Sequence, residues 1–363
     1  MNHRERFLRT FGFKDVDRVP DYEFGYWTET IDRWHMEGLP LDRRTNRDVE
    51  LYLGLEGWDC IEMLPVRTGL WPTLPERIIK EEGGRAIVDD GMGGIYVRTT
   101  TSSSVPHYIR HPLKNRGDWE KLRPFFDPNT PGRFPLNWDD VAKSYMDRDY
   151  PLGISVGSLY GWLRNWMGVE RISIAFYRDP DWVAEMMDTL VNLWITIIRR
   201  ALRDVKVDFA TWWEDMCYSR GPLISVKHFE EFMVPRYRRV TEVLKEYGVY
   251  INILDCDGDI SLLVPGWLKA GINCMFPLEA RFTDFYRLRR EHGGKLLLMG
   301  GVNKMALMAG ERGIERELER LTPLLKEGGY IPTVDHRVPP EVSYRTYLTY
   351  LRKKREWIGR KDI

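Results

Sequence analysis

The stretch VYINILDCDGDI, residues 249–260, joins a short apolar run to three closely spaced acids. Its first half is rich in β-branched and aromatic side chains, which predicts a buried strand. Seven other apolar runs of this kind are spread along the chain, and amphipathic stretches with helical spacing separate most of them. The eight predicted strands are residues 18–24, 59–66, 151–158, 207–215, 249–255, 272–279, 295–301 and 329–336.

Three of the amphipathic stretches have recognisable ends. Residues 225–248 start at Ser225, a favourable N-cap, and finish at Gly248. Residues 310–329 stop at Gly328, and residues 339–359 open with proline. Strands that alternate with helices favour a parallel sheet, and eight such strands close a barrel. The sequence therefore predicts an α/β fold, a single (β/α)8 TIM-barrel domain over residues 1–363.

Residues 81–110 interrupt this alternation after the second predicted strand. They contain the turn signal DDG, residues 89–91, between two short β-prone runs. We expect a β-hairpin inserted into the barrel here.

The composition excludes several classes of protein. The 54 Lys and Arg residues balance 54 Asp and Glu residues, and no basic stripe indicates a nucleic-acid binder. No apolar run approaches the ~18 residues of a membrane span, and the first residues lack the apolar core of a signal peptide. The four cysteines show no CxxC spacing, which is typical of a reducing compartment. We expect a cytoplasmic protein that binds neither nucleic acid nor membranes; whether it is a homodimer is left open.

Acidic side chains recur where the predicted strands end, which is where barrel enzymes have their active sites. Several carboxylates in one cavity repel one another, so either raised pKa values or a bound cation must offset the repulsion. Oxygen ligands with one imidazole suit a divalent metal such as zinc. A plain turn at residues 255–257 and an exposed loop pair at residues 214–215 are the simpler alternatives. The candidate ligands are Asp255, Asp257, Glu214, Glu279 and His336.

Other strand ends supply candidates for catalysis and substrate binding. His336 is followed by an arginine, a valine and two prolines, which fix its position and favour a catalytic role; Asp257 is a second catalytic candidate. Paired glycines let a backbone approach a ligand closely, although a simple turn into a helix explains them equally well. Aromatic side chains after the first, third and fourth predicted strands suit an apolar pocket. The candidate substrate-binding residues are Glu23, Tyr26, Trp27, Trp213, Gly300, Gly301 and Asn303.

Several motifs resemble the uroporphyrinogen decarboxylase superfamily, which includes corrinoid-dependent methyltransferases. They are RERFLRTFGFKDVDRVPDYEFGYW near the start, GPLISVKHFEEFMVPRYRRV in the middle, and GGVNK and GGYIPTVDHRVPPEVSY towards the end. The resemblance covers nearly the whole chain and implies a (β/α)8 barrel. It also implies catalytic roles for Asp59, Tyr160 and His336, which correspond to a strand-two aspartate, a strand-three tyrosine and a late histidine of the decarboxylases.

The two branches of the superfamily make different demands. The decarboxylases carry a paired-arginine motif for a polyanionic tetrapyrrole, whereas the matching stretch here, YEFGYWTET, has no arginine. An acidic mouth without arginines would repel such a substrate. The thiol-methylating branch holds zinc with an H-x-C motif, and this chain has Asp255-Cys256-Asp257 at that position. A harder site of carboxylates and His336 is the expected replacement.

These observations favour a methyltransferase that moves a methyl group from a small methoxylated or methylated substrate to a corrinoid. No corrinoid-binding segment is evident, so the corrinoid is expected on a separate partner protein. The alternative is a decarboxylase that acts on a porphyrinogen or another carboxylated substrate without a cofactor. A third alternative is a barrel that binds a tetrapyrrole or corrinoid without chemistry.

Overall fold

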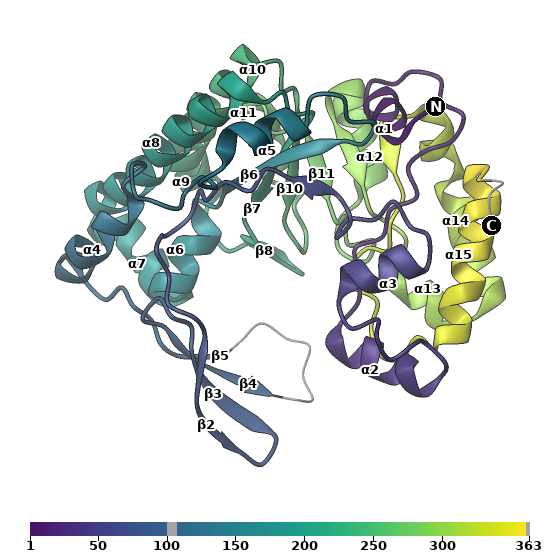
Figure 1. Cartoon of the computed structure of the whole chain (residues 1–363), viewed down its shortest axis with the longest axis horizontal. Coiled ribbons are helices and arrows are strands. Elements are labelled where there is room, and N and C mark those ends of the chain that lie inside the picture. The colour runs from purple at the N-terminus through teal and green to yellow at the C-terminus, as the bar shows by residue number, and fades with distance from the viewer. Residues whose placement is uncertain (100–106, 361–363) are drawn as a thin grey trace.

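A curled parallel sheet of seven strands forms the centre of the computed structural model, which describes residues 1–99 and 107–360 (Figure 1). All neighbouring strands pair in parallel, as short strands joined by helical crossovers require. In spatial order the strands are β1 (Glu62–Met63), β6 (Leu152–Gly157), β7 (Phe209–Trp213), β10 (Ile251–Asp255), β11 (Cys274–Phe276), β12 (Leu297–Met299) and β13 (Tyr330–Ile331). This is the predicted TIM-barrel-like arrangement.

Helices cover the outside of the sheet, with the long α8 beside α10 and α10 beside α11 (Figure 1). The apolar faces of these helices and of the sheet make the larger core of the molecule. The helices of the described residues are α1 (His3–Phe11), α2 (Thr28–Met36), α3 (Asn46–Tyr52), α4 (Arg116–Leu122), α5 (Trp138–Ser144), α6 (Tyr160–Met167), α7 (Val169–Arg178), α8 (Pro180–Asp204), α9 (Val226–His228), α10 (Val234–Glu246), α11 (Val264–Ala270), α12 (Phe285–His292), α13 (Lys304–Met308), α14 (Glu311–Glu327) and α15 (Tyr344–Ile358), with 3-10 turns at Arg123–Phe126 and Gly293–Lys295.

A second apolar cluster fills the inside of the barrel with side chains from β7, β10, β11, β12 and β13. Phe7 of α1 packs against Phe209, the first residue of β7, with 5.2 Å between ring centroids. Helix α1 therefore covers the amino end of the strands, and the carboxyl end is left for a site. Gly153 of β6 makes room for this packing, because a Cβ there would lie 2.5 Å from the Phe209 ring.

The first predicted strand, residues 18–24, is not a regular strand. Residues 19–24 are buried and form no regular strand, and just beyond them Tyr26 forms an isolated bridge with Val338. The carbonyls of this segment still accept from both sides: Asp21 from the Glu56 amide at 3.0 Å, and Gly25 from the Val338 amide at 3.0 Å. The segment thus holds the eighth position of the barrel between β1 and β13. Pro20 has no amide hydrogen to donate, and the Asp21 amide donates to the Glu56 carboxylate at 2.8 Å, so the segment lacks the regular hydrogen bonds of a strand.

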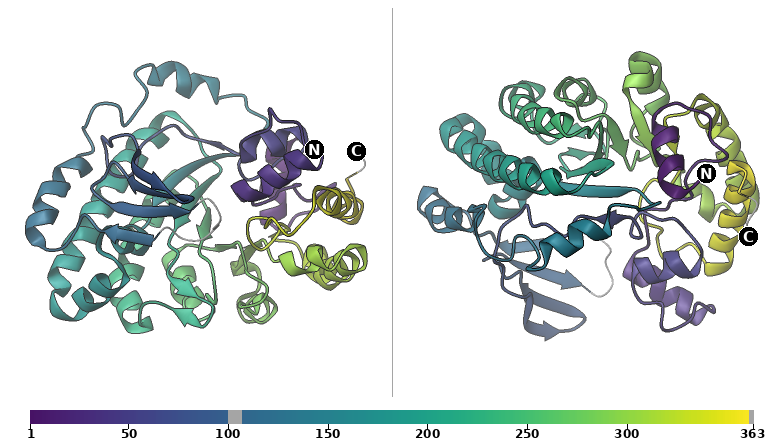
Figure 2. Two further views of the ribbon diagram at one scale, coloured as in Figure 1. Left: turned by 90° about the horizontal axis from the view of Figure 1, so that it is seen from below. Right: turned by 45° about the horizontal axis from the view of Figure 1, so that its top comes forward.

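The insertion after the second predicted strand is larger than the expected hairpin. Strands β3 (Arg85–Asp89) and β4 (Ile95–Thr99) pair antiparallel around the predicted turn, and β2 (Arg77–Glu82) and β5 (His107–Arg110) extend them to a four-stranded sheet. Residues 100–106 of the predicted insertion lie outside the described residues. The sheet projects from the barrel, as the views in Figures 1 and 2 agree.

Three of the four predicted helix starts and stops are confirmed and one is wrong. Gly248, with a φ of 79°, follows the end of α10 and donates to the Lys245 carbonyl at 2.9 Å. Ser225 caps the amide of His228 at 3.1 Å, although a π-helical turn at Phe229–Met233 separates α9 from α10. Gly328 ends α14. The last helix begins at Tyr344 behind the capping residue Ser343, because residues 339–342 form a turn. Within residues 1–99 and 107–360, no helix has the length and apolar character to cross a membrane.

Candidate active site

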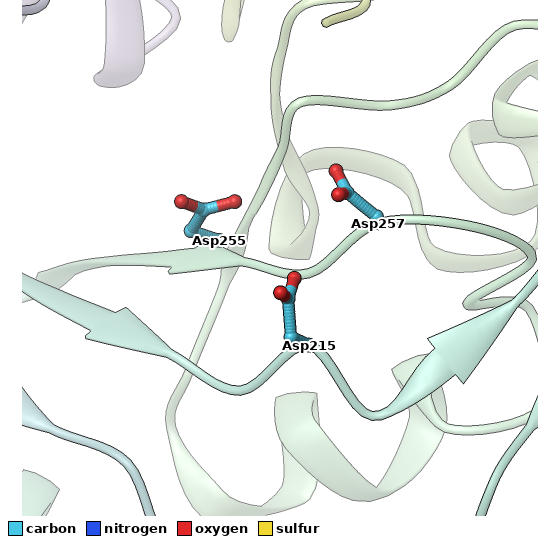
Figure 3. Close-up of side chains that lie close together, drawn as sticks. All are labelled: Asp215, Asp255 and Asp257. Atoms are coloured by element: carbon cyan, nitrogen blue, oxygen red, sulfur yellow. The ribbon is translucent and has the colours of Figure 1, made fainter. Parts of the chain in front are cut away.

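Three aspartates meet at the carboxyl ends of β7 and β10. Asp255 is the last residue of β10, Asp257 follows two residues later, and Asp215 lies two residues beyond β7. Each offers one carboxylate oxygen, and these oxygens all lie within 4.8 Å of one another. Figure 3 shows the three carboxylates pointing to the same side of the strand ends. We call Asp215, Asp255 and Asp257 the acid cluster.

The pairing of the two strands places the acid cluster. Trp213 is the register partner of Asp255, and the amide of Glu214 donates to the Asp255 carbonyl at 2.9 Å. The next residue, Asp215, has a φ of 43°, a left-handed conformation that turns the chain sharply after the strand. On the other side, the amide of Cys256 donates to the Phe276 carbonyl at 2.9 Å. Backbone bonds therefore hold the acids before any ligand binds.

His336 joins the acid cluster from the end of the barrel sheet. Its Nε2 lies 3.3 Å from Asp257 Oδ2. The ring of Trp27 stacks on the imidazole, with 5.4 Å between centroids and 30° between planes. Phe24 makes an edge contact with the same ring at 5.6 Å. Two aromatic neighbours and one carboxylate thus fix the orientation of the imidazole.

Burial and mutual repulsion dominate the electrostatics of the acid cluster. Burial, followed by the charge of Asp257, raises the pKa of Asp215 to about 6. Burial and then the charges of Asp257 and Asp215 raise the pKa of Asp255 well above its ordinary value. Arg164 opposes this shift for Asp215, with 3.7 Å between Nη2 and Oδ2. Arg337 opposes it for Asp255 without contacting the carboxylate within 4.0 Å.

The donor set fits a divalent cation. Three carboxylates and one imidazole are ligands that zinc, manganese and magnesium accept. Asp257 Oδ1 is buried and has no hydrogen-bond partner among the described residues, which is costly unless a ligand occupies the space beside it. The residues that would hold a metal are Asp215, Asp255 and Asp257, whose oxygens lie together, with His336 as a further donor 3.3 Å from Asp257.

Glu214, a predicted metal ligand, accepts hydrogen bonds from the start of α6. Its carboxylate is fully buried and accepts from the amides of Leu159 and Tyr160 at 2.8 and 2.7 Å, and from the Ser158 hydroxyl at 3.0 Å. It thus satisfies free amides at the start of α6, and burial raises its pKa to about 7. Glu214 is not part of the acid cluster, and its neighbour Asp215 is.

Glu279 supports the acid cluster from behind. One of its oxygens accepts from the Gly258 amide at 2.8 Å, and the other lies 3.2 Å from Lys304 Nζ. Both oxygens are therefore engaged, so Glu279 holds the loop that carries Asp257 and is not among the three grouped acids.

The remaining acidic and tyrosine candidates are not among the three residues of the acid cluster. Glu23 is fully buried, with Lys354 Nζ at 2.6 Å and the Tyr350 hydroxyl at 2.8 Å. Tyr160 is 1% exposed, and its hydroxyl has no partner among the described residues. Asp59 is half-buried, and burial raises its pKa; Arg337 opposes that shift.

Tyr26 and the GGVNK motif take part in packing, and Tyr26 also lines a cavity between α2 and α3. Tyr26 is 1% exposed and its hydroxyl lies 3.0 Å from that of Tyr347. A Cβ at Gly300 would lie 1.7 Å from the Pro277 carbonyl oxygen, and one at Gly301 would lie 3.1 Å from the Phe285 ring. Asn303 caps α13 through the Met305 amide at 2.9 Å. These glycines allow neighbouring strand ends to approach one another, and no ligand is needed to explain them.

Trp27 and Trp213 are the two predicted substrate-binding residues that lie beside the acid cluster. Trp27 stacks on His336, and Trp213 immediately precedes the loop of Asp215. Both are partly exposed. The Arg164 guanidinium lies 5.5 Å from the centroid of the Trp213 ring.

Sequence reasoning missed three residues of this region. For Asp215 the signal was present, because it stands in the GluAsp pair after β7, but the sequence does not say which of two adjacent acids turns inwards. Arg337 follows His336 directly, and Arg164 lies on α6, four residues after Tyr160. Nothing in the sequence pattern distinguishes these two from the other arginines of the chain.

Comparisons with known proteins agree with the fold. Residues 90–356 match the family model described as uroporphyrinogen decarboxylase (URO-D). A solved structure, a methyltransferase from Methanosarcina mazei, superposes with a TM-score of 0.61 at 14% sequence identity, covering 98% of each chain. No curated protein sequence matches the chain.

Proposed function

Because the chain belongs to the uroporphyrinogen decarboxylase family, in which the barrel carries enzyme sites, we propose that it is a methyltransferase. The methyl group would come from a small methylated or methoxylated compound. The acceptor would be a reduced corrinoid carried by a separate protein. The acid cluster with His336 is the observation that supports this proposal most strongly.

The acid cluster suits a reaction in which negative charge develops on a leaving atom near a Lewis acid. A divalent metal held by Asp215, Asp255, Asp257 and His336 would polarise the bond between the methyl carbon and its oxygen or nitrogen. When the acceptor attacks the methyl carbon in line, the electron pair of the broken bond stays on that heteroatom. In the alternative without a metal, a protonated His336, whose Nε2 lies 3.3 Å from Asp257, would deliver a proton to the leaving atom.

The aromatic residues would position the substrate. Trp27 is fixed against His336, and Trp213 is fixed by the register of β7 against β10. Flat apolar surfaces on two sides of the acid cluster would exclude water and align the methyl group, which reduces the entropic cost of a displacement.

Decarboxylation of a porphyrinogen is the second candidate, and the family match favours it. The acid cluster argues against it, because three carboxylates within 4.8 Å of one another repel a substrate that itself carries many carboxylates.

Metal content and methyl transfer test the proposal together. Elemental mass spectrometry of the purified protein is expected to find about one divalent metal per chain, and Asp257→Asn and His336→Ala are expected to lose it. Methyl transfer from methoxylated and N-methylated compounds to free cob(I)alamin is followed by absorbance, and carbon dioxide release from uroporphyrinogen is measured in parallel.

Asp259→Asn is the matched control, because Asp259 lies two residues from Asp257 but accepts from the Ser261 amide at 3.0 Å outside the acid cluster. It should keep both metal and activity. Release of carbon dioxide without methyl transfer would replace the proposal with the decarboxylase, and corrinoid binding without either reaction would indicate a non-catalytic barrel.

A further inference from the structure

A cavity of about 400 Å³ lies between α2 and α3, and two arginines line it. Arg44 precedes α3 and Arg337 follows His336, so the two guanidinium groups come from opposite ends of the chain. The remaining walls include Trp27, Thr28 and Asn46. Among the residues that the structure describes, no Asp or Glu lines the cavity, so its lining charge is positive.

Both cavity arginines lack a direct ion pair, although Arg337 also acts at longer range on Asp59 and Asp255. Within residues 1–99 and 107–360, neither Arg44 nor Arg337 has a carboxylate oxygen within 4.0 Å. By contrast, Arg43, Arg47, Arg355 and Arg360 each form an ion pair. The side chain of Arg44 is exposed and makes one long bond, from Nε to the Leu41 carbonyl at 3.4 Å. Arg337 donates to the Tyr26 carbonyl at 3.4 Å and lies 5.6 Å from the Phe24 ring centroid. Both therefore retain free donors.

The cavity and the acid cluster share a wall. Trp27 lines the cavity and stacks on His336, whose Nε2 reaches Asp257. Arg337 lines the cavity and directly follows His336 in the chain. A small molecule with one end in the cavity would therefore present its other end to His336 and the acid cluster.

We propose that this cavity binds a carboxylate group of the substrate through Arg44 and Arg337, so that the enzyme acts on methylated or methoxylated acids. The inference rests on the proposed methyl transfer for the reacting end of the molecule, and on the cavity alone for the anionic end. A guanidinium matches the planar geometry of a carboxylate and binds it with two parallel hydrogen bonds. The cation pair also resolves a difficulty of the acid cluster, which by itself would repel an acidic substrate.

Ligand-detected NMR of the full chain tests the anionic end without any turnover. The probes are 4-methoxybenzoate, its neutral counterpart anisole, acetate and inorganic phosphate. Wild-type protein is expected to bind 4-methoxybenzoate at least about tenfold more tightly than anisole, since charge-assisted hydrogen bonds dominate such recognition. Arg44→Gln and Arg337→Gln should each reduce this preference several-fold.

Arg47→Gln is the control, because Arg47 lies on α3 near Arg44 but pairs with Glu62 at 2.9 Å outside the cavity. Arg44 is exposed, so its variant tests the inference even where Arg337→Gln disturbs the packing on Phe24. Equal binding of 4-methoxybenzoate and anisole, undiminished binding in Arg44→Gln, or no binding of either carboxylate by wild type would overturn the inference. Preference for phosphate over both carboxylates would also overturn it.

The outcomes separate this inference from the proposed function. Carboxylate binding that depends on Arg44, in a protein that transfers no methyl group, supports the subsite and refutes the reaction. Methyl transfer that is equally fast from neutral and acidic methoxylated compounds, and unchanged in Arg44→Gln, supports the reaction and refutes the subsite.

Discussion

Replacing Asp255 by asparagine is expected to have opposite effects on stability with and without a metal. At 4.8 Å, two unit charges in a protein environment repel by about 3.5 kcal/mol with an effective dielectric constant of ~20. Asp255 faces two such charges, on Asp215 and Asp257, while Arg337 and partial protonation offset much of the repulsion. In metal-free protein the variant should therefore be more stable by about 1–2 kcal/mol.

With the metal bound, the order should reverse. A divalent cation at a hundred times its dissociation constant stabilises the wild type by about 2.7 kcal/mol. The variant loses one charged ligand, so its gain from the same metal concentration should be small. Urea unfolding followed by tryptophan fluorescence, in EDTA and in excess zinc, gives the four free energies of unfolding that are needed.

Two results would refute this reasoning. If zinc left the wild-type unfolding midpoint unchanged, the acid cluster would not be a metal site under these conditions. If Asp255→Asn were destabilised in EDTA, repulsion would not be the dominant interaction of that carboxylate. Asp259→Asn controls for the loss of a nearby charge and should respond to zinc as the wild type does.

Three further substitutions test the fold around the site. Burial and the charge of Asp59 raise the pKa of Glu50 to about 8. Between about pH 4.5 and 8 the unfolded chain loses this proton while the folded protein keeps it, so the free energy of unfolding falls as the pH rises. Glu50→Gln should remove this pH dependence and be more stable than the wild type at pH 8.5 by about 2–4 kcal/mol, as measured by urea unfolding across that range. Lys354 is fully buried, 2.6 Å from Glu23, so Lys354→Met should leave an unpaired buried acid and cost about 3–5 kcal/mol by the same assay. Gly300→Ala would place a Cβ 1.7 Å from a backbone oxygen, so soluble yield and thermal midpoint should both fall sharply, whereas Gly310→Ala, with open space around it and a similar φ penalty, should be milder.

The order of strands and helices could be read from the sequence because burial imposes it locally. A strand covered on both faces needs a continuous apolar run, and seven of the eight predicted runs contain a strand of the parallel sheet. Residues 18–24 show where this reasoning ends. Their apolar and acidic pattern resembles a strand with polar edges, but the acids pair with Lys354 and other cations more than 300 residues away. Such long-range charge pairs leave no periodic signal.

The types of residue at the site were also evident in the sequence, but not their partners. Asp255, Asp257 and His336 come directly after apolar runs, and the rule that barrel sites lie at the carboxyl ends of strands brings them to one place. Adjacent residues at a strand end face different neighbours, and only the backbone angles decide which acid enters the site. For Glu214 and Asp215, the free amides of α6 and a φ of 43° made that choice.

The sequence by itself determined the barrel-like fold, the acidic character of its mouth and the position of His336, since each depends on local patterns of burial and spacing. The tertiary structure decided which three acids lie together, which ones instead hold helices and loops, and that Arg44 and Arg337 share a cavity. These outcomes depend on distances between segments that are far apart in the chain, and a charge acts through space without regard to its place in the sequence.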